Sequence, residues 1–214
     1  MKIYLTLFRS RGIRLVNAYF WNAHYFDLKF KTDTHKMREL KDISTSFDNL
    51  ENAVAYMVSW DRTLKQTQRD VMNLFDNLDG HYFVDYGCGK GKVVLWSLNK
   101  DILKIGLRYI GIDFDPSLIA IAKNNAKAMH VDEELFRNAN VLDFPDYPEK
   151  EISFFYNPFD EKILEKLLVK LTRRATVVIY VNPVHRQLFL EAGFKSKIRK
   201  TSWHANLSYE IFTK

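Results

Sequence analysis

A short strand pattern leads directly into a glycine-rich turn at residues 81–91, which read His-Tyr-Phe-Val-Asp-Tyr-Gly-Cys-Gly-Lys-Gly. Residues 90–98 then have the pattern of a helix. Glycines in such a turn let the backbone bend tightly and let a ligand approach without a Cβ in the way. Nucleotide-binding α/β folds place this kind of turn at the carboxyl end of their first strand. The turn therefore predicts an α/β fold with a ligand site at that strand end.

Strand and helix patterns alternate along the rest of the chain. The strand patterns stand at residues 81–86, 107–112, 135–138, 152–156 and 175–181. Helix patterns separate them, and Asp115 with Pro116 supplies the N-cap and first residue of one. After the helix predicted over 184–193, two strand patterns around 202–206 leave no room for a crossover helix. We predict a doubly wound, mostly parallel seven-stranded sheet of the α/β class, with a C-terminal antiparallel hairpin and an N-terminal, mainly helical extension.

A soft boundary near residue 75 divides the chain into two parts. Residues 62–78 have the apolar spacing of an amphipathic helix, and Gly80 can end that helix as its C-terminal cap. We expect residues 1–75 to form a cap or substrate-recognition segment and residues 76–214 to form the ligand-binding domain. The net charge of +6 lies in residues 1–41, which hold nine Lys or Arg and three Asp or Glu. The rest of the chain is electrically balanced.

Composition excludes several classes of protein. A hydrophobic fraction of 47% excludes a disordered chain. The single cysteine excludes a disulfide framework and a cysteine-based zinc site, and it fits a reducing, cytoplasmic location. No apolar run approaches the roughly 18 residues of a transmembrane helix, and the start of the chain does not resemble a signal peptide. The six histidines show no paired ligand spacing, so we expect no metal.

The glycine turn differs from the common phosphate-binding loops. Dinucleotide-binding loops read G-x-G-x-x-G, whereas this turn reads G-x-G-x-G, and no G-K-[ST] ending marks a P-loop. Asp85 at its start would repel a pyrophosphate and attract a cationic ligand. Asp113 ends the next strand, where an acid can accept the hydroxyls of a ribose. Together these residues indicate a nucleoside with positive charge at its other end. The alternative is a tight turn with a helix-capping aspartate.

Four segments resemble motifs of the class I S-adenosylmethionine-dependent methyltransferases. Phe83–Val93 resembles their first motif, and Tyr109–Asp113 resembles their second, acidic one. Asn140–Phe144 occupies the adenine-contacting loop, and Phe154–Phe159 resembles the motif after the fourth strand. The resemblance covers roughly residues 75–214, which it identifies as an S-adenosylmethionine-binding methyltransferase domain. Many members carry Asp where Asn140 stands, although Asn can still accept a hydrogen bond from the adenine amino group.

The segment before the domain carries a second resemblance. Residues 26–34, Phe-Asp-Leu-Lys-Phe-Lys-Thr-Asp-Thr, resemble the leader of a bacterial methyltransferase group of unassigned substrate. In that group a YNPF-like motif follows the fourth strand, and here residues 156–159 read Tyr-Asn-Pro-Phe. This second resemblance brings no substrate with it.

The first resemblance implies S-adenosyl-L-methionine as cofactor and a set of residues that bind it. Asp85 would lie toward the methionine ammonium, Asp113 would hold the ribose, and Asn140 with Val141 would flank the adenine. The remaining members of the predicted cofactor site belong to the glycine turn or follow Asp113: Gly87, Cys88, Gly89, Gly91 and Phe114. We expect Cys88 to act by packing and not as a nucleophile, because no base stands beside it in the sequence.

Asn157, Pro158 and Phe159 are predicted to act on the methyl acceptor. An Asn carbonyl can accept a proton from an amine and aim its lone pair at the methyl group, and Phe159 could stack on the substrate. This favours a nitrogen acceptor in a protein, a nucleic acid or a small molecule. The alternative is that Asn157 and Pro158 cap the next helix while Phe159 lies in the core.

The basic N-terminal segment allows three interpretations. Its aromatic and basic residues could contact a nucleic acid or protein substrate. They could also lie on an anionic membrane surface as a peripheral contact, or form a helical cap with solvated charges. For the whole chain two rival functions remain, a non-catalytic protein of the same fold and, less favoured, an NAD-dependent oxidoreductase.

Overall fold

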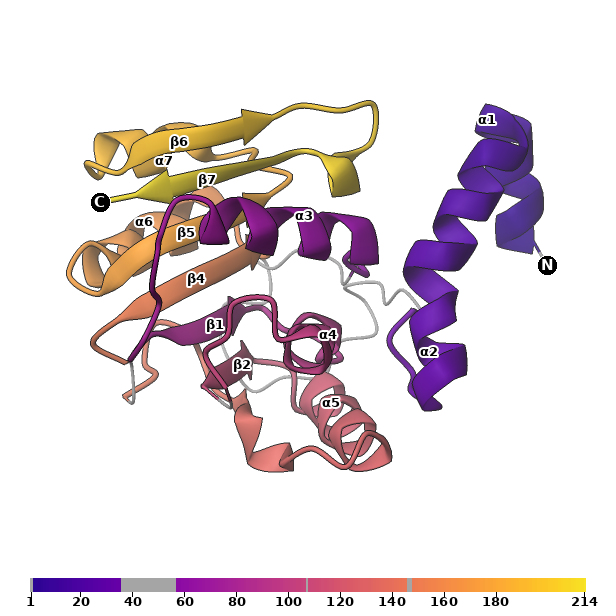
Figure 1. The fold of residues 1–214 in the computed structure, drawn as a ribbon, viewed down its shortest axis with the longest axis horizontal. Helices are drawn as coiled ribbons and strands as arrows, with labels where there is room; N and C mark the ends of the chain where they lie inside the picture. The colour runs from indigo at the N-terminus through magenta and orange to yellow at the C-terminus, as the bar shows by residue number, and fades with distance from the viewer. Residues whose placement is uncertain (1, 36–56, 107, 146–147) are drawn as a thin grey trace.

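The computed structural model describes residues 2–35, 57–106, 108–145 and 148–214. Its centre is a seven-stranded sheet with the strand order β3-β2-β1-β4-β5-β7-β6 (Figure 1). The strands are β1 (Tyr82–Tyr86), β2 (Tyr109–Asp113), β3 (Phe136–Asn138), β4 (Glu151–Tyr156), β5 (Ala175–Val181), β6 (Lys195–Lys200) and β7 (Tyr209–Thr213). Strands β1 to β5 pair in parallel, whereas β7 is antiparallel to both β5 and β6. The predicted fold class, with its closing hairpin, is confirmed.

Helices cover both faces of the sheet. They are α1 (Lys2–Tyr19), the π-helix η1 (Phe20–His24), α2 (Tyr25–Phe30), α3 (Asp61–Met72), α4 (Lys92–Lys100), α5 (Pro116–Ala128), η4 (Glu133–Leu135), α6 (Glu161–Leu171), α7 (Arg186–Glu191) and η5 (Ala205–Leu207). One buried cluster joins α3, α4 and α5 to the sheet, and the other joins α6 and α7 to its opposite face. Successive residues of a strand point to opposite faces of the sheet. Since both faces are covered by helices, the buried strand β5 carries apolar residues on both of its faces. None of the described helices is long and apolar enough to cross a membrane.

Three local predictions can be compared with the structure. Asp115 is the N-cap of α5, with Pro116 as its first residue, as predicted. The helix predicted over 62–78 instead ends at Met72. Past this point the Asn77 side chain accepts a hydrogen bond from the Asp79 N–H at 2.7 Å, and such local bonds compete with helix formation. The predicted helix end at residue 78, with Gly80 as its cap, was therefore wrong.

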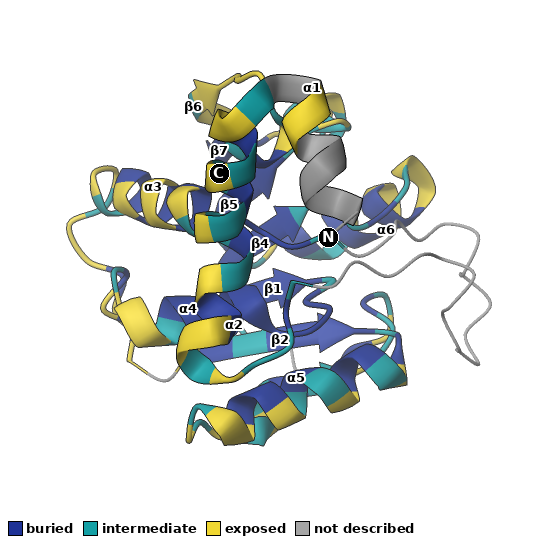
Figure 2. Cartoon of the chain, turned by 90° about the vertical axis from the view of Figure 1, so that its right-hand side faces the viewer, coloured by how far each residue is buried: buried dark blue, intermediate teal, exposed yellow. Residues whose placement is uncertain are grey.

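The N-terminal helices stand across the carboxyl ends of the parallel strands (Figure 1). One side of this segment is buried, including Leu15, Tyr19, Ala23 and Phe26. The other side faces solvent, as the yellow stretches along α1 and α2 show (Figure 2). The basic residues at positions 36, 38 and 41 lie outside the described residues. The division of the chain at residue 75 stays a prediction.

Glu151 is a buried carboxyl group at the start of β4 and is 0% exposed. Its Oε1 accepts hydrogen bonds from the Tyr86 hydroxyl at 2.8 Å and the Ser153 hydroxyl at 2.5 Å. Burial raises its pKa to about 7. Since the pKa is higher in the folded than in the unfolded chain, the folded protein binds more protons between these two values. The free energy of unfolding therefore falls as pH rises through this window.

Replacing Glu151 by Gln should remove most of this pH dependence, because Gln cannot ionise. Between pH 5 and pH 8 the wild-type protein should lose about 1–3 kcal/mol more stability than Glu151→Gln, from ~1.4 kcal/mol per unit of pKa shift. Urea unfolding at both pH values measures the difference, in which any constant cost of the amide cancels. Glu149→Gln, at an exposed carboxyl two residues away, is the matched control and should behave as wild type. Equal slopes for wild type and Glu151→Gln would contradict the prediction.

Candidate active site

The turn after β1 requires glycine at two of its positions. Gly87 and Gly91 have φ values of +76° and +82°, in the left-handed region. A Cβ on Gly87 would lie 2.5 Å from the Cβ of Pro158, and one on Gly91 would lie 2.6 Å from the Phe136 ring. The turn is thus held between the loop after β4 on one side and β3 on the other. Pro158, predicted on the acceptor side, packs directly on the predicted cofactor turn.

Asp113 connects the glycine turn to the end of β2. It is 6% exposed, its Oδ2 accepts from the Gly89 N–H at 2.8 Å, and its Oδ1 accepts from the Asp115 N–H at 3.0 Å. Burial raises its pKa to about 6, although these two backbone bonds oppose the shift. A carboxylate has about four acceptor positions, so each oxygen can accept one further donor. The group is therefore equipped both to fix the turn and to receive a ligand hydroxyl.

Asp85 is a buried carboxyl group whose Oδ2 has no hydrogen-bond partner among the described residues. It is 2% exposed and lies on β1, two residues before the first glycine. Burial, and then repulsion from Asp113, raises its pKa well above the usual range. A buried polar group without a partner is costly, and a cationic ligand group would supply both a donor and a countercharge. The sequence predicted a nucleoside with a cationic end at Asp85 and Asp113, and the burial of both carboxyl groups is compatible with that prediction.

Asn157 follows β4 directly and adopts a left-handed conformation, with φ +43°. Its Oδ1 accepts a hydrogen bond from the Tyr180 hydroxyl at 2.8 Å. Tyr180 lies on β5 next to β4, and burial raises its pKa to about 12, so its hydroxyl stays protonated. Tyr180 thereby orients the Asn157 amide. No sequence pattern indicated this partner, because its contact depends on the register between β4 and β5.

The sequence allowed this motif either to act on the methyl acceptor or to cap the next helix with Phe159 in the core, and Phe159 and Asn157 differ in which alternative describes them. Phe159 is 8% exposed and packs edge-to-face on Phe155, with ring centroids 6.5 Å apart. The packing alternative therefore describes Phe159. The capping alternative does not describe Asn157, because the N-cap of α6 is Asp160, whose carboxylate accepts from the Ile163 N–H at 3.0 Å.

The remaining predicted residues lie around the same strand ends. Asn140 accepts from the Leu142 N–H at 3.0 Å through its Oδ1, which shapes the loop after β3. Val141 is buried, whereas Phe114 is half-buried just after Asp113. Cys88 is also buried, and burial raises the pKa of its thiol well above the usual range. A neutral buried thiol fits the packing role expected for it and not that of a nucleophile.

Comparisons with known proteins agree with this geometry. A protein family described as a methyltransferase domain matches residues 77–182. A solved structure of a putative RNA methyltransferase from Pyrococcus horikoshii shares 15% identity over 89% of this chain and 96% of that chain, with a TM-score of 0.55. A precorrin-6y C5,15-methyltransferase from Geobacter metallireducens shares 16% identity over 81% of this chain and 93% of its own, with a TM-score of 0.50. No curated protein matches the chain in sequence.

Residues 77–182 therefore form a methyltransferase domain, and the sheet has the class I methyltransferase fold. The four motifs that resemble this family all lie at the carboxyl ends of β1 to β4, which are neighbouring strands and end on the same side of the sheet. The structural relatives are only distantly similar in sequence, and what they support is the fold.

The N-terminal segment contacts the methyltransferase domain at the glycine turn. Lys90 of the turn pairs with Asp33, with 3.2 Å between Nζ and Oδ1. Asn125 of α5 accepts from the Asp33 N–H at 2.8 Å through its Oδ1, and its Nδ2 donates to the carbonyls of Asp33 and Lys90 at 3.1 and 3.0 Å. One amide therefore ties the segment to the turn. Sequence reasoning missed Asn125, because its partners lie 92 and 35 residues away.

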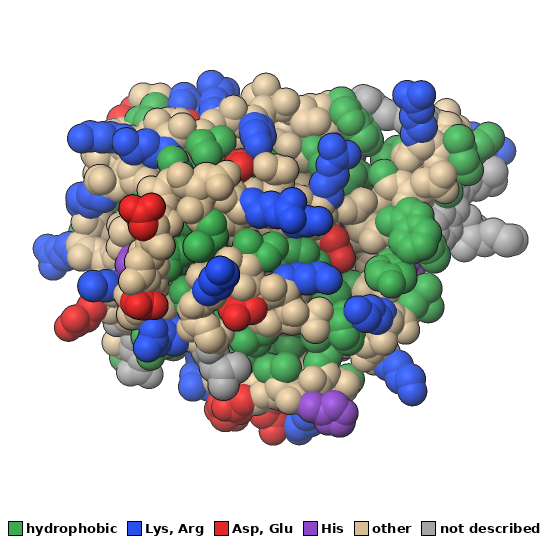
Figure 3. All heavy atoms as spheres, viewed as in Figure 1, with side chains coloured by type: hydrophobic (Ala, Val, Ile, Leu, Met, Phe, Trp, Pro, Cys, Tyr) green, Lys and Arg blue, Asp and Glu red, His purple; other side chains and the backbone are tan. Residues whose placement is uncertain are grey.

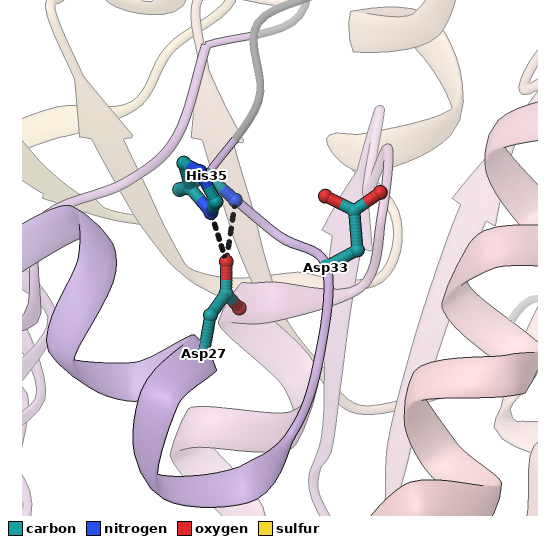
Figure 4. Close-up of side chains that lie close together, drawn as sticks. All are labelled: Asp27, Asp33 and His35. Atoms are coloured by element: carbon teal, nitrogen blue, oxygen red, sulfur yellow. Dashed lines mark hydrogen bonds and ion pairs between the residues drawn. The ribbon is translucent and has the colours of Figure 1, made fainter. Parts of the chain in front are cut away.

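Asp27 organises the part of this segment that reaches the turn. Its carboxylate accepts from Thr32, Thr34 and His35, including a 2.5 Å contact with the His35 Nδ1. Figure 4 shows Asp27, Asp33 and His35 together, and their potential ligand atoms lie within 4.8 Å of one another. The histidine spacing in the sequence gave no sign of this grouping. Since Asp27 and Asp33 already have donors, the described contacts account for the cluster as a polar network that shapes the segment.

Proposed function

We propose that this methyltransferase uses S-adenosyl-L-methionine to methylate a nitrogen of a protein, nucleic acid or small-molecule acceptor. The observation that carries the proposal is Asp85, a buried carboxyl group beside the glycine turn whose Oδ2 lacks a partner among the described residues. When bound, the cofactor would supply a methyl group on a positively charged sulfur. Its ammonium would complete the surroundings of Asp85, and its ribose hydroxyls would donate to Asp113.

The other cofactor contacts follow from position. Gly87, Gly89 and Gly91 allow the cofactor to lie against the backbone. The loop after β3, with Asn140 and Val141, would flank the adenine, while Cys88 and Phe114 would complete the surroundings. In this proposal the chain binds, aligns and excludes water, and it forms no covalent bond to the methyl group.

Asn157 would position the acceptor. Its Oδ1 has one lone pair in the bond from Tyr180 and a second available for an acceptor N–H, since a carbonyl oxygen accepts two bonds. The contact between Pro158 and the position of Gly87 holds this amide close to the cofactor turn. Asn157 would hold the acceptor nitrogen with its lone pair directed at the methyl group that the cofactor would supply, and the methylated nitrogen would then lose a proton.

Asn157→Ala should spare cofactor binding and lower methyl transfer by about 100-fold or more, because loss of alignment alone has an effect of this order. Titration calorimetry measures binding, and transfer of labelled methyl into fractionated cell extract measures activity. Tyr180→Phe keeps the ring packing and removes the bond to Asn157, so it should lower activity by a smaller factor. Full activity of Asn157→Ala would remove Asn157 from the mechanism.

Titration with S-adenosylmethionine, S-adenosylhomocysteine and NAD tests the function itself. We expect the protein to bind S-adenosylmethionine and S-adenosylhomocysteine and not to bind NAD. Binding of NAD alone would favour an oxidoreductase. Against this alternative stand Asp85 and Lys92, which occupies the position of the third glycine in the G-x-G-x-x-G pattern. Binding of S-adenosylmethionine without transfer to any protein, RNA or small-molecule fraction would favour the non-catalytic alternative.

A further inference from the structure

The N-terminal helices carry a stripe of large apolar side chains on their solvent side. These residues are 43–69% exposed: Ile13, Trp21, Tyr25 and Leu28. The rings of Trp21 and Tyr25 contact each other, with centroids 5.2 Å apart. Figure 3 shows hydrophobic side chains gathered over this end of the molecule. We call these four residues the outer stripe.

The outer stripe occupies one face of a continuous helical segment. Relative to Trp21, the other members stand eight residues before, four after and seven after, which is the spacing of one helix face. The opposite face is apolar as well and is buried, through Leu15, Tyr19, Ala23 and Phe26. Only one of these two faces is needed to hold the segment on the domain. The second has no cover among the described residues, and exposed patches of this kind mark contact with a partner or a membrane.

The exposed charges that the structure describes among residues 1–31 have a single sign, and Asp33, just beyond them, is paired with Lys90. Arg9, Arg14, Lys29 and Lys31 are exposed. The one acidic residue among residues 1–31 is Asp27, which is 7% exposed and bonded within its own segment. The exposed part of the segment therefore combines aromatic and aliphatic side chains with positive charge.

We propose that the outer stripe and its basic neighbours dock on the surface of an anionic lipid bilayer. Helices that lie in the membrane interface place Trp and Leu among the acyl chains and Lys and Arg at the lipid phosphates. The apolar side chains would then contact acyl chains and the basic side chains would contact lipid phosphates. Aromatic rings such as Trp21 and Tyr25 are favoured at the membrane interface.

Two other occupants fit less well. A second copy of the chain would bring the same four positive charges together across the interface, which is unfavourable. A nucleic acid would satisfy the charges and could stack on the aromatic rings, but it would leave the aliphatic Ile13 and Leu28 in water. Only a bilayer offers a hydrocarbon layer directly beneath a layer of anions.

Docking would bring the active-site edge of the sheet toward the lipid surface. The N-terminal helices stand across the carboxyl ends of the parallel strands (Figure 1), and Asp33 and Asn125 tie the end of their segment to the glycine turn. Binding to lipid is nevertheless independent of the proposed methyl transfer, so either can fail without the other.

Sedimentation of the full chain with vesicles tests the proposal. One set of vesicles contains phosphatidylcholine alone, and the other contains phosphatidylcholine with phosphatidylglycerol. The wild-type chain should bind the anionic set at least tenfold more tightly, and high salt should weaken this binding. The double variant Trp21→Ser, Leu28→Ser should bind the anionic set at least tenfold more weakly than wild type.

Matched variants keep the result interpretable. Val169→Ser, Val184→Ser removes two other apolar side chains that are 64% and 61% exposed, and it should bind as wild type. All four substituted positions are exposed, so circular dichroism and melting temperature should not change. Failure of the wild type to bind anionic vesicles, or equal binding by Trp21→Ser, Leu28→Ser, would overturn the proposal. The proposal would also be overturned if the wild type formed a dimer in solution that Trp21→Ser, Leu28→Ser dissociates, because the outer stripe would then contact a second copy.

Discussion

Replacing Asp113 by alanine is expected to weaken S-adenosyl-L-methionine binding by about ten- to a hundredfold. Two ribose hydroxyls would lose a charged acceptor, and hydrogen bonds to charged groups contribute about 1.5–3 kcal/mol. The structure adds a second cause, because Asp113 also accepts from the Gly89 N–H and holds the turn against which the cofactor would lie. Calorimetric titration gives the affinity. Asp76→Ala, at an exposed carboxyl group outside the site, is the control and should bind as wild type.

The same carboxyl group predicts a pH dependence of binding. The pKa of Asp113 is raised to about 6, so below this pH the group becomes a neutral acid and a weaker acceptor. Affinity should therefore fall as pH drops from 7 to 5. Below the pKa the fall is at most about tenfold per pH unit, because binding requires one carboxyl group to release its proton. Asp113→Asn is neutral throughout and should have a flatter profile. An unchanged affinity for Asp113→Ala at pH 7 would show that the ribose binds elsewhere.

Replacing Gly91 by alanine is expected to destabilise the protein by about 2–5 kcal/mol. The left-handed conformation at φ +82° costs an alanine roughly 1–2 kcal/mol, and forcing an extra group into a packed site costs roughly 1–3 kcal/mol. The new Cβ would meet the buried Phe136 ring at 2.6 Å and the Cβ of Ala122 at 3.1 Å. Denaturant unfolding at constant pH measures the loss.

Gly193→Ala separates the two contributions to that loss. Gly193 has a similar φ of +88°, but a Cβ there would meet nothing within 4 Å. This variant should show only the conformational cost, so the difference between the variants is the cost of the clash. Equal losses in both would mean that Phe136 moves aside freely and that β3 does not hold the turn.

Local sequence patterns were sufficient for much of the fold and for the glycine turn. The glycine turn, the cap formed by Asp115 and Pro116, and strand β5 each result from the preferences of a few neighbouring residues, so they could be predicted. The helix was predicted over residues 62–78, six residues beyond the observed end of α3 at Met72, because apolar spacing continues past the point where the helix stops. Residues 77–79 instead form a local turn, in which the Asn77 side chain accepts from the Asp79 N–H, and such a contact leaves no periodic signal.

The predictions for the acceptor side show where local reasoning ends. Asn157 and Phe159 stand two positions apart in one motif, and the sequence treated them as one functional unit. In the structure Asn157 bonds to Tyr180 at the strand ends, while the Phe159 ring packs in the core beneath. The direction of each side chain depends on the backbone conformation at Asn157 and on the packing of α6, and neither can be read from residue types.

The sequence by itself determined the alternation of strands and helices along the chain, the glycine turn, and the positions of Asp85 and Asp113 beside it. These depend on backbone conformations and spacings that short segments impose on themselves. Only the tertiary structure decided that Asp85 is buried with an unpartnered oxygen, that Asn125 ties the N-terminal segment to the turn, and that this segment has one apolar face covered and one exposed. Burial and long-range pairing arise when distant segments meet, and no local pattern records which segments those are.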